Sequence, residues 1–524
     1  MIFTYRLGLI VMVTTIVGVY MGCSSSPSGP VSSPGPAGAV TLEMGMTRIE
    51  QPGLDPFVVH VTASRNGNPL PGQNLILDVP KGSVSAVTDH GDGTYSFQVT
   101  PASTGTYPVT VQIGGSQADS LGLNSDVSLT RKAVVLDANV AGSGQPMAVP
   151  GTFVNTAGYE DGITITPDGE YLFVQYGPVY MSGPLYYTQI CSSSAYSMGY
   201  DLNTCSTRPN SSFIFETVGP YNDQFRPSFP IGGISKEKLL HLSGLVIPGV
   251  VNGILAFPTV FYGFKRQADG TFAQPFKLAF DDSKGVNGPF GLSFKMNGDG
   301  TGTFVVAWDN YFNNLGDDGA DVYTGTITFG RNNSMGQVTY NGDSFASITP
   351  TVSPVGFSSH TGVQGNPHLY YDQTGKIKSI WTDDERVSHD LTVYRLTSGS
   401  FPSGTWVKTS LPSDINTTAD ESQPFFTGTR LILRRNSNIV AHTYTPTNGA
   451  CASGFSHNDC WGAESVLIGA NGHTGAGEIA TVGEPTLAQH EGRTYLYFAY
   501  VEVRSNPNVS LVDLNADAGF VEIP

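Results

Sequence analysis

A loosely repeated unit runs through residues 151–524 and limits the possible folds of this chain more than any other feature. Each unit begins with a small or polar residue before Pro or Gly and an apolar pair, and the clearest units continue through a Gly turn into an aromatic-rich strand. No helical period runs through this region. The units have anchors at Asp161, Pro227, Pro289, Pro367, Pro424 and Pro485. Near-regular units of this size predict the blades of a β-propeller with inserted loops, roughly six in number and between five and seven.

The clearest of these units resembles the WD-like, TolB-type propeller repeat. The segment TPDGEYLFV (residues 166–174) matches the Pro-Asp-Gly turn and the following strand of that repeat. Residues 321–323 (DVY) and 391–394 (LTVY) follow acidic loops, as the third strand of the repeat does. The unit near Pro227 is degenerate. The resemblance implies an all-β propeller whose loops can vary without loss of the fold.

Residues 41–130 have a different pattern, in which short alternating strands are separated by turn clusters at sandwich spacing. The segment DHGDGTYSFQVTPASTGTYPVTV (residues 89–111) contains Asp92-Gly93, which predicts a positive-φ hairpin turn. The next strand should place Tyr95, Phe97 and Val99 on one face. This segment resembles the filamin-type and related bacterial immunoglobulin-like repeats. The resemblance covers about 75 residues and implies a module that presents or spaces another domain.

The N-terminus has the pattern of an export signal. Arg6 precedes an apolar run from Leu7 to Met21, and Gly22 and Cys23 follow. The run is shorter than the ~20 residues of a membrane-spanning helix, and no later segment is apolar enough to span. We therefore expect residues 1–22 to be a signal peptide.

A Cys at this point, followed by a polar stretch, resembles a bacterial lipoprotein signal. The family pattern usually has Leu three residues before the Cys, whereas Tyr20 stands there in this chain. The resemblance implies that Cys23 carries the lipid, and Ser24 resembles the residue found in lipoproteins sent to the outer membrane. Residues 23–40, rich in Ser, Pro and Gly, should form a flexible tether.

Four cysteines remain after Cys23, in two pairs that are close in sequence. An even number in an oxidising compartment predicts disulfides, Cys191 with Cys205 and Cys451 with Cys460. Metal binding is the other interpretation, but neither pair has the spacing of a zinc knuckle.

The chain has a formal charge of −17, which would repel phosphate backbones and makes nucleic acid an unsuitable partner. Acidic turns at residues 297–303, 316–321 and 381–385 raise the possibility of calcium sites, but none completes the ligand pattern of an EF-type loop. We interpret them as tight hairpin turns. His368, His389 and His442 are interpreted as turn or strand residues. No metal and no cofactor is expected.

Three acids beside the anchors, Asp161, Glu421 and Glu484, come from different units and should start near the central funnel. Two such carboxyls could act as acid and as base or nucleophile in a propeller-type glycoside hydrolase. The other interpretation is that an acid beside the anchor serves strand entry in every blade. Signatures of serine esterases, zinc proteases, phosphate loops and the sialidase Asp-box are absent from the sequence.

The sequence therefore predicts an all-β cell-envelope lipoprotein, with an immunoglobulin-like domain at residues 41–130 and a propeller at 151–524. The favoured function is display of the propeller to bind a protein or a glycan. The alternative is a carbohydrate-active enzyme that works in the propeller funnel. Fold alone does not decide between them.

Overall fold

The computed structural model describes most of residues 39–177 and 260–524 and a few short pieces between them; the longer gaps are 178–216, 225–249, 279–288, 310–319, 330–335 and 506–511. The elements described are strands, apart from one 3-10 turn at Asn458–Cys460. No helix within the described ranges is long and apolar enough to cross a membrane. The all-β prediction is therefore confirmed. The signal segment, Cys23 and the pair Cys191 and Cys205 lie outside the described residues.

The N-terminal domain is an immunoglobulin-like pair of sheets. One sheet has the order β1-β2-β7-β5, with β3 and β6 at its sides, and β4, β8 and β9 belong to the second. The strands are β1 (Val40–Arg48), β2 (Phe57–Arg65), β3 (Asn68–Pro69), β4 (Ile76–Asp78), β5 (Ser83–Val84), β6 (Thr88–Asp89), β7 (Thr94–Thr100), β8 (Gly105–Ile113) and β9 (Val127–Val135). Alternate residues of these strands fill one apolar core between the sheets.

The predicted hairpin turn is present in this domain. Gly93 has φ 85°, and Asp92 accepts hydrogen bonds from the N–H and the hydroxyl of Thr94. Tyr95, Phe97 and Val99 of β7 share one buried face, as the alternation predicted. Tyr95 also donates its hydroxyl to Leu70 O at 2.7 Å, which ties the strand to the preceding loop.

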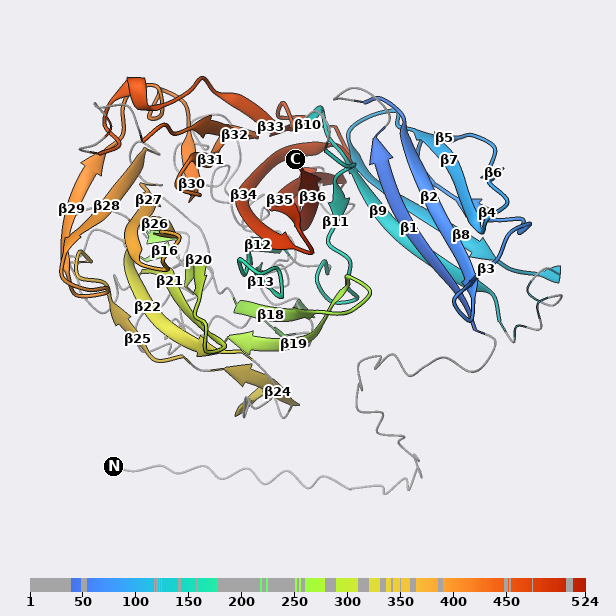
Figure 1. Cartoon of the computed structure of the whole chain (residues 1–524), viewed down its shortest axis with the longest axis horizontal. Coiled ribbons are helices and arrows are strands. Elements are labelled where there is room, and N and C mark those ends of the chain that lie inside the picture. Colours follow the sequence, from blue (N-terminus) through green and yellow to red (C-terminus); the bar gives the residue numbers. More distant parts are fainter. Residues whose placement is uncertain are drawn as a thin grey trace, which may run out of the picture. The chain divides into compact units, whose positions relative to one another are not determined.

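The propeller consists of five blades in the part of the chain that the structure describes, and each blade contains four consecutive strands of one sheet (Figure 1). Blade 1 contains β12 (Tyr159–Ile165), β13 (Tyr171–Gly177), β18 (Val260–Arg266) and β19 (Phe272–Leu278). Blade 2 contains β20 (Phe290–Met296), β21 (Thr301–Asp309), β22 (Ala320–Thr328) and β25 (Val352–Pro354). Blade 3 contains β26 (Gly365–Tyr371), β27 (Ile377–Asp383), β28 (Leu391–Ser398) and β29 (Thr405–Ser410).

The last two blades follow the same plan. Blade 4 contains β30 (Glu421–Phe426), β31 (Arg430–Arg435), β32 (Asn438–Thr443) and β33 (Ser465–Gly469). Blade 5 contains β34 (Ile479–His490), β35 (Arg493–Ser505), β36 (Val512–Ile523) and, from the other end of the domain, β11 (Met147–Ala148). β11 also pairs with β9, so this sheet continues into the second immunoglobulin-like sheet.

Two outer edges carry extra strands. β24 (Asp343–Ile348) and β23 (Gly336–Tyr340) extend blade 1, and β10 (Ala138–Asn139) pairs with β33 of blade 4. Two isolated hairpins, β14 (Thr217–Val218) with β15 (Asp223–Gln224) and β16 (Val250–Val251) with β17 (Ile254–Leu255), complete the described strands.

The ring of blades closes on itself. The inner strands contact one another in the cycle β12, β20, β26, β30, β34 and back to β12. The unit expected near Pro227 lies outside the described residues, and its place in the chain falls between β13 and β18, which pair directly with each other. The cycle of inner strands therefore has five members, at the lower end of the expected range.

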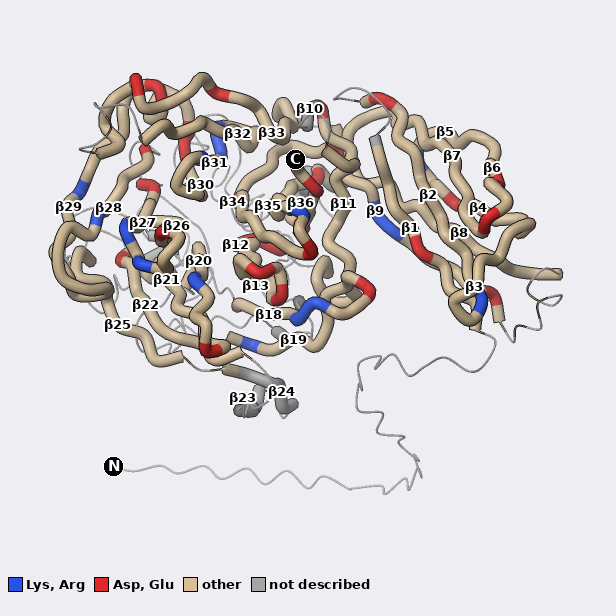
Figure 2. Tube along the Cα trace, viewed as in Figure 1, with Lys and Arg blue, Asp and Glu red and all other residues tan. Residues whose placement is uncertain are grey.

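Of the three acidic segments interpreted as hairpin turns, residues 297–303 form one through Asp299, whereas residues 381–383 belong to strand β27 and residues 316–319 lie outside the described residues. Asp269, Asp299 and Asp372 each accept the N–H and the hydroxyl of the Thr two residues later. Such Asp side chains fix the geometry of the hairpin turn. Figure 2 shows acidic segments spread over both domains rather than collected into one patch.

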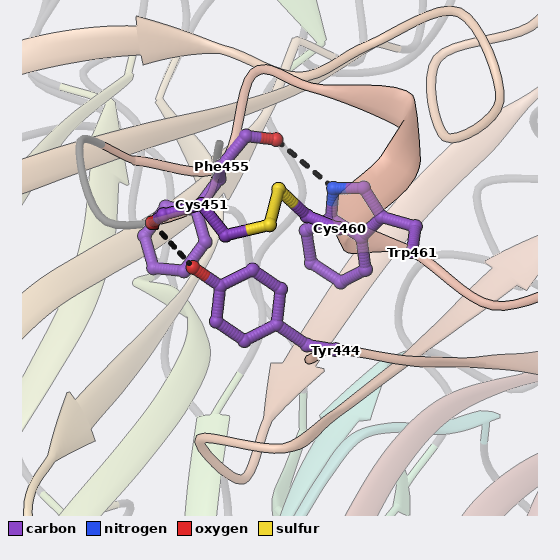
Figure 3. Close-up of a disulfide and its surroundings, with 5 residues drawn as sticks. All are labelled: Tyr444, Cys451, Phe455, Cys460 and Trp461. Carbon is purple, nitrogen blue, oxygen red and sulfur yellow. Dashed lines mark hydrogen bonds between the residues drawn. A yellow bond between two sulfur atoms is a disulfide. The ribbon is translucent and has the colours of Figure 1, made fainter. Parts of the chain in front are cut away.

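One predicted disulfide is confirmed. Cys451 and Cys460 are bonded beside the outer strand of blade 4 and pack against aromatic rings (Figure 3). Trp461 donates its indole N–H to Phe455 O at 2.9 Å, and Tyr444 donates its hydroxyl to Cys451 O at 3.4 Å. The bond thus closes a short loop over the apolar core of the blade.

Candidate functional site

Every inner strand contains a β-bulge at the same height in the ring. The register with the second strand shifts there, and one residue has positive φ in each blade. The five residues are Gly162 (59°), Gly291 (62°), Asn366 (40°), Gln423 (55°) and Glu484 (55°). A bulge leaves one residue unpaired and bends the strand. The bulges therefore form a ring of irregular backbone at the centre of the propeller.

Glycine is required at some of these positions because space is short. A Cβ at Gly291 would lie 2.5 Å from Asn366 Cα, and one at Gly162 would lie 2.7 Å from Gln175 Cβ. Gln423 and Glu484 instead hold large side chains in the left-handed region, which costs of order 1–3 kcal/mol per residue. Their side chains must therefore contribute interactions that Gly could not.

Those interactions link each blade to the next. Asp383 Oδ2 accepts Gln423 N–H at 2.7 Å, Gln423 Oε1 accepts Glu484 N–H at 2.8 Å, and Glu484 Oε2 accepts Ile163 N–H at 2.8 Å. Asp383 Oδ2 also accepts a hydrogen bond from Asn366 Nδ2 at 3.0 Å. These bonds join blade 3 to blade 4, blade 4 to blade 5 and blade 5 to blade 1. At each of these three seams between neighbouring blades, a side-chain oxygen of one blade accepts a backbone N–H at the bulge of the next.

A second row of contacts lies two residues beyond the bulge. His368 is 7% exposed and its Nε2 lies 3.0 Å from Phe426 O in the next blade. Since a carbonyl oxygen only accepts, Nε2 carries the proton, and Nδ1 is left to accept the Ser293 hydroxyl at 3.3 Å. Burial lowers the pKa of His368 to about 4. The ring is therefore neutral near pH 7 and joins blades 2, 3 and 4.

A cavity of about 330 Å³ occupies the channel between the five inner strands. Its wall contains neutral polar side chains and aromatic rings from different blades. These include Thr164, Ser293, His368, Tyr370, Tyr371, Gln423, Phe425, Thr486, Gln489 and Thr494. Glu484 is the one acid in the described wall, which holds no Lys or Arg. A volume of this size lies at the lower end of the range of small-molecule pockets.

The structure brings together two of the three acids proposed from the sequence. Asp161 hydrogen-bonds Glu484 across the seam between blade 1 and blade 5. Burial raises the pKa of Asp161, while the bond to Glu484 and the charge of Arg434 act in the opposite direction. Glu484 lines the cavity, whereas Asp161 does not. The two carboxyls therefore interact with each other rather than facing each other across the cavity.

The third acid, Glu421, lies elsewhere. It is fully buried, accepts the N–H and the hydroxyl of Thr417, and pairs with Arg435 Nε at 3.0 Å. Glu421 is not part of the cavity wall. The three acids differ in their position relative to the bulge of their own strand. Asp161 lies one residue before its bulge, Glu421 lies two residues before, and Glu484 is the bulge residue itself. The shared repeat position assumed from the sequence is therefore wrong.

Glu160 is the true counterpart of Glu421 in blade 1. It accepts the N–H of Thr156 at 3.0 Å and also its hydroxyl, in the manner of Glu421 with Thr417. Its other partner differs, because Glu160 hydrogen-bonds Asp517 of β36 rather than an Arg. Burial, and next the charge of Asp517, raise the pKa of Glu160 well above its usual range.

Sequence reasoning missed the motif behind this similarity, although it is visible in the sequence. Asn-Thr-x-x-x-Glu occurs as residues 155–160 and again as residues 416–421. It also missed Ser293, Asp383 and Gln423, because their roles depend on contacts between blades. His368 and His442 lie on β26 and β32, as expected, and His389 is outside the described residues. No cluster of three or more metal-ligating side chains occurs within the described ranges.

One of the two domains matches a known family. Residues 37–132 match the family described as Invasin, domain 3. The predicted immunoglobulin-like fold is therefore confirmed, while the boundaries 41–130 and the filamin-type and TolB-type resemblances remain predictions. No curated protein matches the sequence.

Solved structures with a similar backbone include carbohydrate-active propellers. A β-xylosidase/α-arabinofuranosidase from a compost microbial metagenome has 8% identity and a TM-score of 0.34, covering 71% of this chain and 94% of its own. An α-L-arabinanase of Cellvibrio cellulosa has 11% identity and a TM-score of 0.28, covering 49% and 88%. The Trypanosoma rangeli sialidase has 10% identity and a TM-score of 0.30, covering 87% and 60%. Likeness at this level carries no conclusion about activity.

Proposed function

We propose that this chain is a lipid-anchored protein of the cell envelope that binds a neutral glycan in the central cavity of its propeller. The cavity wall carries the proposal. It combines hydroxyl, amide and imidazole groups with aromatic rings from β20, β26 and β30, and Glu484 is the one charged side chain in the described wall. Hydroxyl-rich, uncharged ligands suit such a lining, because neutral donors and acceptors fix orientation while rings cover apolar faces.

Charge argues against other small-molecule classes. A phosphate or carboxylate ligand would meet Glu484 and no Lys or Arg in the described wall. The anchor at Cys23 and a position in the outer membrane are part of the proposal. In this arrangement the immunoglobulin-like domain stands between the tether and the propeller.

The arrangement of acids favours binding over hydrolysis. A glycosidase needs two carboxyls about 5–5.5 Å or about 6.5–9.5 Å apart across the sugar bond. Asp161 and Glu484 are hydrogen-bonded to each other, and Glu421 is buried in an ion pair with Arg435. Hydrolysis by the propeller remains the alternative, and the same experiment tests it.

The test is binding of the full-length protein in detergent to an array of neutral, acidic and sulfated glycans. Gln489, an exposed residue of the cavity wall, is replaced by Trp to narrow the cavity. Val407→Trp is the matched control, since Val407 is 47% exposed on the outer strand β29. We expect Gln489→Trp to weaken binding of a neutral glycan about tenfold or more and the control to leave it unchanged. Preference for acidic glycans, or an equal effect of both variants, would contradict the proposal.

Released sugar is measured in the same samples. Turnover by the wild-type protein that falls by about 100-fold or more in folded Asp161→Asn or Glu484→Gln is the size expected for loss of a general acid or base. That result would establish the enzymatic alternative. Capture of a protein in place of a glycan would count against the assigned ligand class.

A further inference from the structure

The side chains two residues beyond the five bulges differ in what they contact. This second row consists of Thr164, Ser293, His368, Phe425 and Thr486. Thr164 donates its hydroxyl to Leu292 O in blade 2 at 2.6 Å. The Ser293 hydroxyl accepts Leu369 N–H in blade 3 at 3.0 Å, and His368 Nε2 lies 3.0 Å from Phe426 O in blade 4. The polar members in blades 1 to 3 therefore each hydrogen-bond the following blade.

The second row and the bulges together close the whole ring. The second row supplies a side-chain hydrogen bond at the seams from blade 1 to blade 4. The bulges supply one at the seams from blade 3 through blade 5 to blade 1. Every seam thus has such a bond without a contribution from Phe425 or Thr486. These two side chains line the cavity and are not required for closure.

Thr486 is the polar member of the second row that has no partner in the described part of the chain. The residue is 6% exposed, and its hydroxyl makes no hydrogen bond to the described residues. A buried hydroxyl without a hydrogen bond costs free energy, and native proteins retain few of them. Because Thr486 lines the cavity and its hydroxyl keeps a small accessible surface, a ligand in the cavity can supply the missing partner.

Gln423 places a fixed donor near this hydroxyl. Its Oε1 accepts the N–H of Glu484, two residues before Thr486, at 2.8 Å. Since a backbone N–H only donates, the amide oxygen must face Glu484 and the amide NH2 group points elsewhere. Within the described residues this NH2 group makes no hydrogen bond, and Gln423 lines the cavity. The donor is therefore oriented before a ligand arrives, which reduces the entropy lost on binding.

Phe425 adds an apolar surface at the same seam. It is half-buried and lies two residues beyond Gln423 on β30. Its ring centroid is 4.2 Å from that of His368, with an angle of 41° between the rings. His368 is itself held by hydrogen bonds to neighbouring blades, so it limits the movement of the Phe425 ring. A fixed aromatic ring suits the C–H face of a sugar.

We infer that the cavity holds a sugar ring against blades 4 and 5. The Thr486 hydroxyl and the Gln423 NH2 group hydrogen-bond two sugar hydroxyls, and the Phe425 ring covers an apolar face of the sugar. The inference rests on the proposed glycan function and names the residues that select the ligand. It follows from the asymmetry of the second row, whose polar groups in blades 1 to 3 already bond other blades.

The experiment measures binding of neutral trisaccharides of glucose, galactose, xylose and arabinose to the full-length protein in detergent, by calorimetry. Thr486→Val removes the hydroxyl at nearly constant shape, and Thr486→Ser keeps it. We expect Thr486→Val to weaken binding about two- to tenfold, the size of one neutral hydrogen bond, and Thr486→Ser to bind as the wild type does.

A second threonine separates a binding role from a structural role. Thr324 is also 6% exposed, but it lies outside the cavity wall and donates its hydroxyl to Phe304 O at 2.7 Å. Thr324→Val should therefore unfold at a lower urea concentration and keep the wild-type affinity. Thr486→Val should lose affinity without loss of stability, because its hydroxyl has no bond to give up.

The two possible failures are distinguishable. Trisaccharide binding that is equal in wild type and Thr486→Val but weakened in Gln489→Trp would overturn this inference and leave the proposed function standing. Absence of binding to any neutral glycan, in this titration and on the array, would remove the proposed function and the inference with it.

Deoxygenated forms of the bound trisaccharide cover the case in which Thr486→Val does not fold. In the wild type, replacement of a sugar hydroxyl by hydrogen should weaken binding about two- to tenfold at two positions, one for Thr486 and one for Gln423. One of these two losses should disappear in Thr486→Val, as expected for partners in a double-mutant cycle. Undiminished wild-type binding of every deoxygenated form would overturn the inference.

Discussion

Asn155 and Asn416 occupy the same position in two different blades and make the same pair of hydrogen bonds. Asn155 Nδ2 donates to Ala518 O at 3.0 Å and its Oδ1 accepts Ala518 N–H at 2.7 Å. Asn416 does the same with Leu391, at 2.9 and 3.0 Å. In both cases one amide satisfies the backbone of the preceding blade's third strand. The first residue of the Asn-Thr-x-x-x-Glu motif is therefore a clamp between blades.

Replacement of Asn416 by Ala should destabilise the propeller by about 1–3 kcal/mol, because two backbone groups of Leu391 lose their partners. Urea unfolding measures this change. Asn68→Ala is the control, since exposed Asn68 makes only a 3.5 Å contact with Asn66 O, and it should change stability by less than about 0.5 kcal/mol. Equal effects of both variants would show that the clamp contributes nothing.

The disulfide of blade 4 should also be measurable. Cys451→Ser with Cys460→Ser removes a cross-link with a sequence separation of 9, which should cost about 2–3 kcal/mol in a chain-entropy estimate. Non-reducing peptide mapping should find Cys451 bonded to Cys460 and Cys191 to Cys205. Free thiols at Cys191 and Cys205 would refute the second pairing, which lies outside the described residues.

Attachment to membranes should depend on Cys23, whose thiol is the group in the tether able to carry a thioether-linked lipid. Cys23→Ser should abolish incorporation of labelled fatty acid and release the protein from membranes. Cys460→Ser, a change at a cysteine far from the signal, serves as the control and should keep the label. Lipid incorporation that survives in Cys23→Ser would exclude the anchor.

Local patterns predicted the parts of this fold that depend on local geometry. Alternation in residues 94–100 gave the buried face of Tyr95, Phe97 and Val99, and Asp92-Gly93 gave the turn. The number of blades was harder to predict. The degenerate unit near Pro227 was counted as a possible blade, although it lies between β13 and β18, which pair directly with each other. Sequence spacing does not distinguish an insertion within a blade from a blade.

The candidate site was harder to predict for a related reason. The anchors used to align the units are not equivalent: Asp161 lies before its bulge, whereas Pro485 lies after its bulge. A bulge shifts register by one residue, and no side-chain pattern marks where it occurs. Contacts such as Gln423 with Glu484 join residues 61 apart. They follow from ring closure and are not visible in either segment alone.

The last prediction concerns His368, which is buried between blades and whose pKa burial lowers to about 4. Protonation favours the unfolded chain, where the imidazole has its ordinary pKa of about 6.5. Stability contributed by the neutral ring is therefore complete above pH about 6.5 and is lost as the pH falls toward about 4, by up to about 3 kcal/mol.

His368→Gln should keep the donor to Phe426 O and remove the titration, so its stability should fall less than that of the wild type over this range. His490→Gln is the control for the substitution itself, because His490 is partly exposed. Burial also lowers the pKa of His442, so an acid-dependent decrease will remain in every variant. The decisive quantity is thus the difference in slope between wild type and His368→Gln, measured by urea unfolding at each pH. Parallel curves would mean that His368 has the same pKa in the folded and the unfolded chain, and the neutral hydrogen-bonded link between Ser293 and Phe426 would have to be abandoned.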